Sequence, residues 1–200
     1  MLREVRLAMI NCVLATVFAL FAYAHLQQFV TQPRLSLVLL VGMETVLVIL
    51  FLIRKDPDRT SYSWQAWLTT TAGTLYPLLL RPAEIAEDVL VGQIIQTIGV
   101  ALQIGALLAL NRSMGLLPAH RGVKTSGAYR IVRHPLYAAY AVALIGYLIN
   151  NWSGYNVAVI AIGMAFQIMR IRNEERLLLG YSDYVTFAQK TRWRLLPFVW

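Results

Sequence analysis

Long stretches without a charged side chain constrain the fold of this 200-residue chain more than any other feature. A helix needs about 20 mostly apolar residues to cross the hydrocarbon core of a bilayer, within a range of about 17–25. Several stretches meet or approach that length, and the turn-rich sequence NNWSG separates the last two, which should form a tight helical hairpin. We expect six membrane-spanning helices, over residues 7–24, 35–53, 64–80, 89–110, 135–149 and 155–169.

The composition agrees with this interpretation, because 58% of the residues are hydrophobic and only 14% are charged. An ordinary soluble domain has about 45–50% apolar and about 25% charged residues. The net charge of +8 does not indicate a nucleic-acid partner, since no basic stretch stands apart from the apolar segments. Cys12 is the single cysteine, and no zinc-ligand spacing is present. The predicted fold class is all-α: one domain, residues 1–200, forming a polytopic membrane helix bundle of about six spans, four of them within residues 1–110.

Basic residues are distributed unevenly between the two sides of this predicted bundle. If residue 1 is cytoplasmic, six spans place all but two of the 18 lysine and arginine residues, Arg34 and Arg81, on the cytoplasmic side. Cytoplasmic loops carry such an excess, so we predict that both ends of the chain are cytoplasmic and that the first apolar stretch is a retained span. Glu44, inside the second span, should face a polar neighbour such as the threonine-rich third span. The predicted outer side also carries acidic residues: Glu84, Glu87 and Asp88.

The sequence GAYRIVRHPLYAAY, residues 127–140, places basic side chains directly before an apolar segment. Pro135 suits the first position of a helix, where its missing N–H would be unpaired in any case, and His134 then falls at the cap. The free N–H groups of a first helical turn favour an anion. Cations that merely set the membrane topology are the alternative. Further basic and aromatic side chains that suit a nucleotide-like ligand surround this turn: Tyr129, Arg130, Arg133, Tyr137 and Tyr140.

A second cluster, RIRNEER at residues 170–176, follows the last apolar stretch. Arg170 and Glu174 are four residues apart, so they share one face of a continuing helix. The hairpin returns the end of its second helix to the start of its first, which should bring both residues near His134 and Pro135. A cationic and an acidic cluster at one membrane surface suit a zwitterionic, positively charged cofactor. Ion pairs on an ordinary solvated helix are the alternative.

These two motifs in this order, GAYRIVRHPLY and then NEERLLLGYSDYVTFAQKTRWRLLP, resemble the isoprenylcysteine carboxyl methyltransferase family and its phospholipid methyltransferase relatives over roughly residues 105–200. The family glycine of the first motif is Ala139 here. The resemblance implies an integral-membrane enzyme that uses S-adenosylmethionine, with residues 111–200 supplying a cofactor-binding loop, the hairpin and C-terminal helices. The family pattern, Arg-His-Pro-x-Tyr followed by an apolar run and Glu-Glu, falls on Arg133, His134, Pro135, Tyr137, Glu174 and Glu175.

The resemblance also implies a role for each of these residues. Arg170 would hold the carboxylate of the acceptor, and Glu174 or Glu175 would contact amino or ribose groups of the cofactor. A carboxylate is already nucleophilic, so its methylation needs positioning and an arginine fork rather than a general base. The candidate catalytic residues are Arg170 and Glu174, no metal site is expected, and the candidate cofactor-binding residues are Lys124, Gly127, Tyr129, Arg133, His134, Pro135, Tyr137 and Glu175.

The acceptor stays open, because residues 1–100 match the family only as generic spans. We expect a lipophilic or prenylated acceptor that enters from the bilayer and carries an isoprenylcysteine-like carboxylate, with phospholipid amines and small thiols as alternatives. A sterol-type membrane reductase that binds NADPH is a second hypothesis, although the chain has fewer spans and lacks an extra set of cations for a 2′-phosphate. A membrane transporter or scaffold without enzymatic activity is the third.

Overall fold

The computed structural model is helical apart from two strands of two residues each, and it describes residues 2–31, 33, 35–81 and 89–200. Arg34, Glu84, Glu87 and Asp88, which entered the predicted charge distribution, lie outside the described residues. Within the described part, three 3-10 helices accompany the α-helices: η1 (Tyr76–Leu79), η2 (Asn111–Ser113) and η3 (Gly127–Arg130). The α-helices are α1 (Leu2–Thr31), α2 (Leu35–Ile53), α3 (Trp64–Leu75), α4 (Leu90–Leu110), α5 (Pro135–Asn150), α6 (Gly154–Leu178) and α7 (Ser182–Lys190).

Each of the six predicted segments contains a helix, but the helices differ in length. Three described segments have the length and apolar composition to cross a membrane: Val5–Thr31, Leu90–Ser113 and Gly154–Leu178. Leu37–Ile53 and Pro135–Asn150 are apolar but shorter. The third predicted segment is divided into α3 and η1 at Pro77, because proline has no N–H to continue the α-helical hydrogen bonds. The count of six spans therefore stays a prediction.

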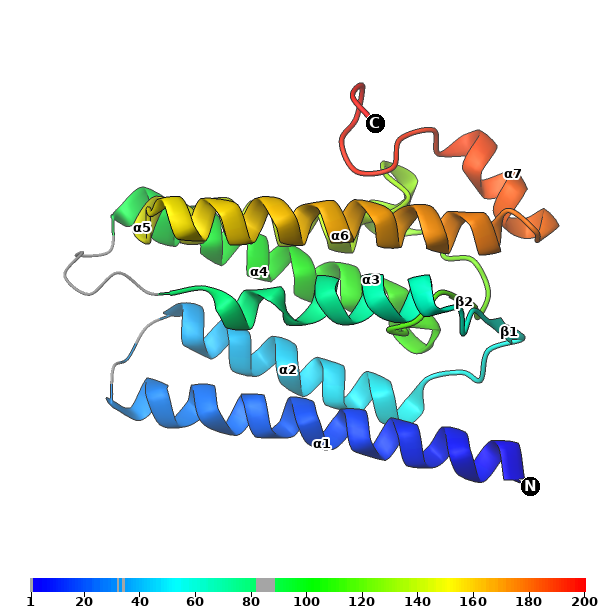
Figure 1. Ribbon diagram of the computed structural model, residues 1–200, viewed down its shortest axis with the longest axis horizontal. Helices are drawn as coiled ribbons and strands as arrows, with labels where there is room; N and C mark the ends of the chain where they lie inside the picture. Colours follow the sequence, from blue (N-terminus) through cyan, green and yellow to red (C-terminus); the bar gives the residue numbers. More distant parts are fainter. Residues whose placement is uncertain (1, 32, 34, 82–88) are drawn as a thin grey trace.

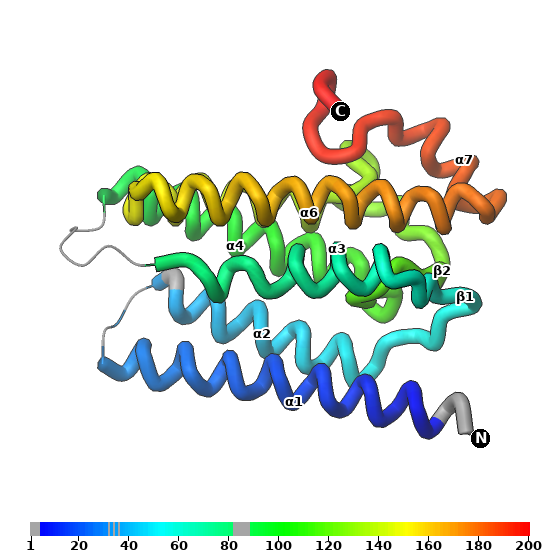
Figure 2. The backbone as a smooth tube through the Cα atoms, viewed as in Figure 1, coloured from blue at the N-terminus to red at the C-terminus, as the bar shows by residue number. Residues whose placement is uncertain are grey.

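The long helices run along one axis and form a bundle with α1 at its edge (Figure 1). α1 packs on α2, α2 on α4, α4 on α5, and α3 on α6. Phe51 and Leu107 are fully buried in the apolar core between the first, second and fourth helices. The start of α1, both strands and α7 lie at the same end of the bundle, which we call the α7 end (Figures 1 and 2).

A pair of ionisable side chains joins α1 to α2. His25 Nδ1 lies 2.9 Å from Glu44 Oε1, and the Glu44 side chain is almost fully buried. The sequence predicted a polar neighbour for Glu44, which is confirmed. The partner is His25 rather than the threonines of α3, because α2 packs mainly on α1 and α4.

Residues 151–153 join α5 to α6 in a tight turn, as predicted, but the two helices share few contacts with each other. α5 packs mainly on α4, where Gly99 and Gly146 let the backbones approach closely. A Cβ atom at Gly146 would lie 2.3 Å from Gln96 N. α6 packs mainly on α3 instead, so the predicted tight hairpin holds only for its connecting turn.

α6 continues without a break to Leu178, so the last predicted span and the RIRNEER motif form one helix. α7 follows after a short turn and packs through Tyr184 and Phe187 against Tyr129. An antiparallel pair of two-residue strands, β1 (Arg59–Thr60) and β2 (Ala119–His120), joins two loops at the α7 end. The sequence did not predict these strands, because two residues are too few for a periodic pattern.

Candidate functional site

Arg133, His134 and Pro135, which we call the RHP motif, form the start of α5 at the α7 end of the bundle. Pro135 is the first helical residue and His134 is the N-cap, both as predicted. Residues after α7 fix this turn, since Arg133 N–H donates to Trp193 O at 2.8 Å and His134 N–H donates to Arg194 O at 2.9 Å. The motif is therefore held by the segment that follows α7, a contact that the sequence did not indicate.

Four side chains contact the Glu175 carboxylate beside this turn. Arg133 Nε donates to Glu175 Oε1 at 2.7 Å, and His134 Nε2 lies 3.3 Å from the same oxygen. The Tyr184 hydroxyl donates to Oε1 at 3.3 Å, and Arg194 Nε donates to Oε2 at 2.6 Å. Both carboxylate oxygens are thus engaged by protein groups, and the Glu175 side chain is only 5% exposed. We call these five residues the Glu175 cluster.

A second cluster lies next to it on α5 and α6. The Tyr137 hydroxyl donates to Glu174 Oε2 at 3.1 Å. The guanidinium carbon of Arg170 lies 5.5 Å from the centre of the Tyr137 ring. We call Tyr137, Gln167, Arg170 and Glu174 the Arg170 cluster. The contacts of Tyr137 and His134 with the two glutamates show that the two sequence motifs meet in space, as the sequence predicted.

Arg170 is 7% exposed, and two nitrogens of its guanidinium donate hydrogen bonds to neighbouring protein groups. Its Nη2 donates to Leu116 O at 2.6 Å, and its Nη1 donates to Thr74 Oγ1 at 3.3 Å. Arg170 Nε is buried and has no hydrogen-bond partner among the described residues. A buried donor without a partner costs about 1–3 kcal/mol, so this N–H is a candidate donor for a ligand.

Gln167 lies one helical turn before Arg170. It binds a carbonyl group of α3 that has no helical hydrogen-bond partner. Its Nε2 donates to Gly73 O at 2.7 Å. Gly73 O is available because Pro77, four residues on, has no N–H to donate. Gln167 Oε1 is buried, and no described group donates to it. The Arg170 cluster therefore contains one unpaired donor and one unpaired acceptor on the same face of α6.

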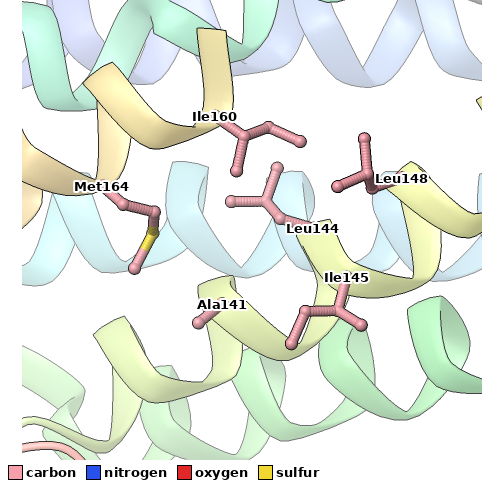
Figure 3. Close-up of a pocket in the computed structure, with 6 residues that line it drawn as sticks. All are labelled: Ala141, Leu144, Ile145, Leu148, Ile160 and Met164. Atoms are coloured by element: carbon pink, nitrogen blue, oxygen red, sulfur yellow. The ribbon is translucent and has the colours of Figure 1, made fainter. Parts of the chain in front are cut away.

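An apolar pocket of about 240 Å³ opens between α5 and α6 (Figure 3). Ala141 lies one turn beyond Tyr137 on α5, and Met164 lies six residues before Arg170 on α6. The pocket follows from the packing of α5 on α4 and of α6 on α3, which separates the two helices. It is lined by Ala141, Leu144, Ile145, Leu148, Ile160 and Met164.

The loop before η3 carries the remaining predicted site residues, and they differ in their surroundings. Gly127 is exposed and has a positive φ of 60°, a conformation that favours glycine. Lys124 is half-buried, and within the described part of the chain it has no hydrogen bond or ion pair to either cluster. Tyr129 is buried against Tyr184 and Phe187, and burial raises the pKa of its hydroxyl well above the usual range.

Arg121 is a candidate site residue that the sequence reasoning assigned only to membrane topology. It is buried, and its Nε donates to Lys55 O at 3.1 Å. Burial and the charge of Arg54 lower the pKa of Arg121 to about 10, while the charge of Glu174 acts in the opposite direction. The side chain therefore places a second cation in the electrostatic range of the Arg170 cluster. No local pattern distinguishes it from other loop arginines.

His120 joins three segments at the α7 end and was also missed. Its Nδ1 lies 2.7 Å from Asp58 Oδ2, its Nε2 lies 3.0 Å from Asp183 Oδ2, and its ring stacks on Tyr181 at 3.9 Å. Burial lowers the pKa of His120, but the hydrogen bonds to the two aspartates outweigh burial, so the pKa is raised. Asp58 on one side and Tyr181 and Asp183 on the other lie about 60 residues from His120 in sequence, so no spacing could have indicated these partners.

Residues 83–180, about half of the chain, match the model of the isoprenylcysteine carboxyl methyltransferase (ICMT) family. A comparison with curated proteins found no match. The matched range contains both the start of α5 and the end of α6, where the two clusters meet. Members of this family are methyltransferases, which decides against the reductase and the non-enzymatic scaffold. The chain belongs to the ICMT family of membrane methyltransferases that use S-adenosylmethionine.

Proposed function

We propose that this protein methylates the carboxylate of an isoprenylcysteine-like acceptor that reaches the Arg170 cluster from the bilayer. The observation that carries this proposal is that the cluster and the apolar pocket lie along the same two helices, α5 and α6. A buried arginine with an unpaired N–H lies on α6, six residues beyond Met164 of a pocket lined only by apolar side chains. Such a site suits a ligand with an anionic head and an apolar tail.

The pocket supports a role in binding the prenyl tail. Its residues on α5 continue the helix face of Tyr137, since Ala141, Leu144 and Leu148 follow at spacings of 4, 7 and 11 residues. Because burying one CH₂ group stabilises a complex by about 0.8 kcal/mol, a prenyl chain there would supply much of the affinity. The tail would lie between the two helices, with the carboxylate at their α7 end.

Arg170 is the residue we assign to the acceptor carboxylate. Its Nη atoms already bind Leu116 O and Thr74 Oγ1, which fixes the orientation of the guanidinium. The N–H at Nε, which has no partner, would donate to a carboxylate oxygen, and charge-assisted bonds of this kind are about twice as strong as neutral ones. A carboxylate needs no deprotonation, so Arg170 acts by positioning rather than by moving a proton.

The remaining site residues support binding of the cofactor. Bound S-adenosylmethionine supplies a methyl group on a positively charged sulfur. Glu174 suits its ammonium or ribose hydroxyl groups, because only Oε2 of this carboxylate is bonded to Tyr137. Glu175 would instead keep Arg133, His134 and Pro135 in place, while Lys124, Gly127 and Tyr129 would form the loop side. The unpaired Gln167 Oε1 and the half-buried carboxylate of Glu174 fit this group.

The charge distribution supports a cytoplasmic position for this site. Basic residues of the loops at the α7 end include Arg54, Lys55, Arg112 and Arg121. Cytoplasmic loops are rich in lysine and arginine, so we assign the α7 end and both chain termini to the cytoplasmic side of the membrane. On this assignment, six spans form one domain, with residues 1–110 as the N-terminal part and residues 111–200 as the cofactor-binding part.

A comparison of two acceptors tests the proposed reaction. Purified protein in lipid nanodiscs is given methyl-labelled S-adenosylmethionine and either N-acetyl-S-farnesylcysteine or its carboxamide. We expect label only with the carboxylate, in a product that releases methanol in base. Base-stable label in the nanodisc phospholipids would instead indicate an amine acceptor.

Two arginine variants assign the acceptor site. Arg170→Lys should raise the KM for the acceptor by at least about 10-fold, because lysine cannot reproduce the fixed fork. The affinity for S-adenosylhomocysteine should stay within about twofold of wild type, since this cofactor product carries no acceptor group. The control is Arg172→Lys, two positions along the same helix at an exposed site, which should change neither value.

A further inference from the structure

The segment after α7 forms a compact loop, residues 193–200, with strongly exposed apolar side chains. Leu196 is 56% exposed, Phe198 is 87% exposed and Val199 is 74% exposed. Figure 1 shows that this loop turns back from α7 and lies level with the middle of α6 along the long axis of the bundle. The loop is therefore level with the helices along this axis rather than beyond their ends.

The backbone of this loop satisfies most of its own hydrogen-bond donors. The N–H groups of Arg194 and Leu195 donate to Trp200 O at 2.8 and 3.0 Å. Those of Val199 and Trp200 donate to Leu196 O at 3.2 Å each. Pro197 has no N–H to satisfy. Irregular backbone is costly in lipid because its polar groups lack water, and a self-bonded loop avoids much of that cost.

The backbone conformation of Phe198 is unusual and is independent of the exposure of its side chain. Its φ of 66° is in the left-handed region, which is rare for a bulky residue, and it is one of two non-glycine residues with positive φ in the described chain. Such a conformation is strained and persists only where other interactions stabilise it. Apart from a ring contact with Trp193 at 5.4 Å, the Phe198 side chain points away from the protein.

We propose that the 193–200 loop inserts into the lipid leaflet at the α7 end and that this contact helps to hold the Glu175 cluster together. The occupant of the exposed surface is the bilayer, because the loop lies beside helices whose own outer surfaces are apolar and exposed. Lys190 and Arg192 are exposed next to the loop and complement anionic lipid headgroups. Trp193 and Trp200 are residue types that favour the membrane interface.

The loop contacts the site directly, so its position affects the Glu175 cluster. Arg194 bonds Glu175 Oε2 at 2.6 Å, while the carbonyl oxygens of Trp193 and Arg194 accept from the backbone of the RHP motif. Lipid contact with Phe198 and Val199 would restrain the same short loop. This consequence rests on the proposed cofactor site, whereas the insertion itself does not.

A fluorescent label at position 198 tests insertion. Full-length protein carrying Cys12→Ser and Phe198→Cys is labelled with NBD and placed in nanodiscs that contain doxyl-labelled lipids. We expect the label to lose most of its emission to the lipid quencher, whereas a control label at Gln189→Cys, on exposed α7, keeps its emission. Quenching at 198 only by aqueous iodide would overturn the proposal, as would protection from both quenchers, which would indicate a protein partner.

A double variant tests the coupling to the site. Phe198→Ser with Val199→Ser should weaken binding of S-adenosylhomocysteine in nanodiscs by at least about 5-fold, the lower end of typical coupling between two sites. Leu179→Ser, which removes an exposed apolar side chain in the turn after α6, is the control and should bind as wild type. Unchanged affinity in the double variant would overturn the coupling. Absence of binding by wild type would instead refute the proposed cofactor site while leaving the quenching result valid.

Discussion

Replacing Glu175 with glutamine should destabilise the α7 end of the protein more than any other single change in the site. The carboxylate accepts hydrogen bonds from Arg133, Tyr184 and Arg194 and lies 3.3 Å from His134 Nε2. An amide has one acceptor oxygen and no charge, so it cannot replace both carboxylate oxygens. The variant leaves the cationic side chain of Arg133, which is 8% exposed, without an anion.

The size of the effect follows from the burial of each partner. Removing one member of a buried ion pair typically costs about 3–5 kcal/mol, because the other charge stays buried without compensation. Arg194 is 35% exposed, so its share lies in the range of about 0–1 kcal/mol that is typical near the surface. Arg133 keeps contacts to the carbonyl oxygens of Ala188, Thr191 and Arg192 at 3.2–3.4 Å, which lessens the loss. We therefore expect a destabilisation of about 2–4 kcal/mol.

Thermal unfolding in detergent, followed by intrinsic fluorescence, measures this effect. A loss of that size lowers the Tm of a chain of this length by roughly 4–16 °C on the scale of soluble domains. Glu174→Gln is the matched control on the neighbouring residue. It should lower the Tm by no more than about 3 °C, because glutamine keeps an oxygen that can accept the hydrogen bond from the Tyr137 hydroxyl. Equal Tm values for Glu175→Gln and wild type, or a larger drop for Glu174→Gln, would refute the reasoning.

Three further perturbations test other parts of the structure. The pKa of His120 is raised, so its contribution to stability is present below an unfolded pKa of about 6.5 and is lost as the pH rises through the folded pKa. The Tm should fall from about pH 6 to about pH 9 more steeply in wild type than in His120→Gln, and equal slopes would contradict this assignment. Gly99→Ala should destabilise the α4–α5 contact by at least about 1–3 kcal/mol, because its Cβ would lie 2.3 Å from Ala143 N, whereas Gly105→Ala, with nothing within 4 Å, should not. Ala141→Trp should fill the pocket and raise the KM for a farnesylated acceptor, with unchanged affinity for S-adenosylhomocysteine, and an unchanged KM would place the tail elsewhere.

The main features of the site were predictable because they depend on local patterns. Pro135 defines the start of α5 through its missing N–H, and the spacing of Arg170 and Glu174 puts them on one helix face. The NNWSG turn then brings the two segments to the same end of the bundle. Each of these inferences needs only a few neighbouring residues, and the structure agrees with each.

The orientation of the two glutamates could not be predicted in the same way. Successive residues on a helix point about 100° apart, so either Glu174 or Glu175 could have faced the RHP turn. The choice depends on Arg194 and Tyr184, which reach Glu175 from segments whose positions the sequence does not define. The two-residue strands and the partners of His120 are long-range contacts of the same kind.

The helix pairing differed from expectation for a steric reason. A short turn between α5 and α6 suggests that the two helices pair, but small residues allow α5 to approach α4 more closely. Gly99 and Gly146 remove the side chains that would separate those backbones. Their significance emerges only once the facing residues are known, so the pocket between α5 and α6 could not be inferred from sequence.

Calorimetric titration of S-adenosylhomocysteine into the protein in lipid nanodiscs tests the central claim most directly, namely that the start of α5 and the end of α6 form one cofactor site. Wild type should show saturable binding at one site, and His134→Ala and Glu174→Gln should each weaken it by at least about 10-fold. A Tm measurement establishes that each variant is folded at the titration temperature. Binding by both folded variants with wild-type affinity, or no binding by folded wild type, would contradict the account.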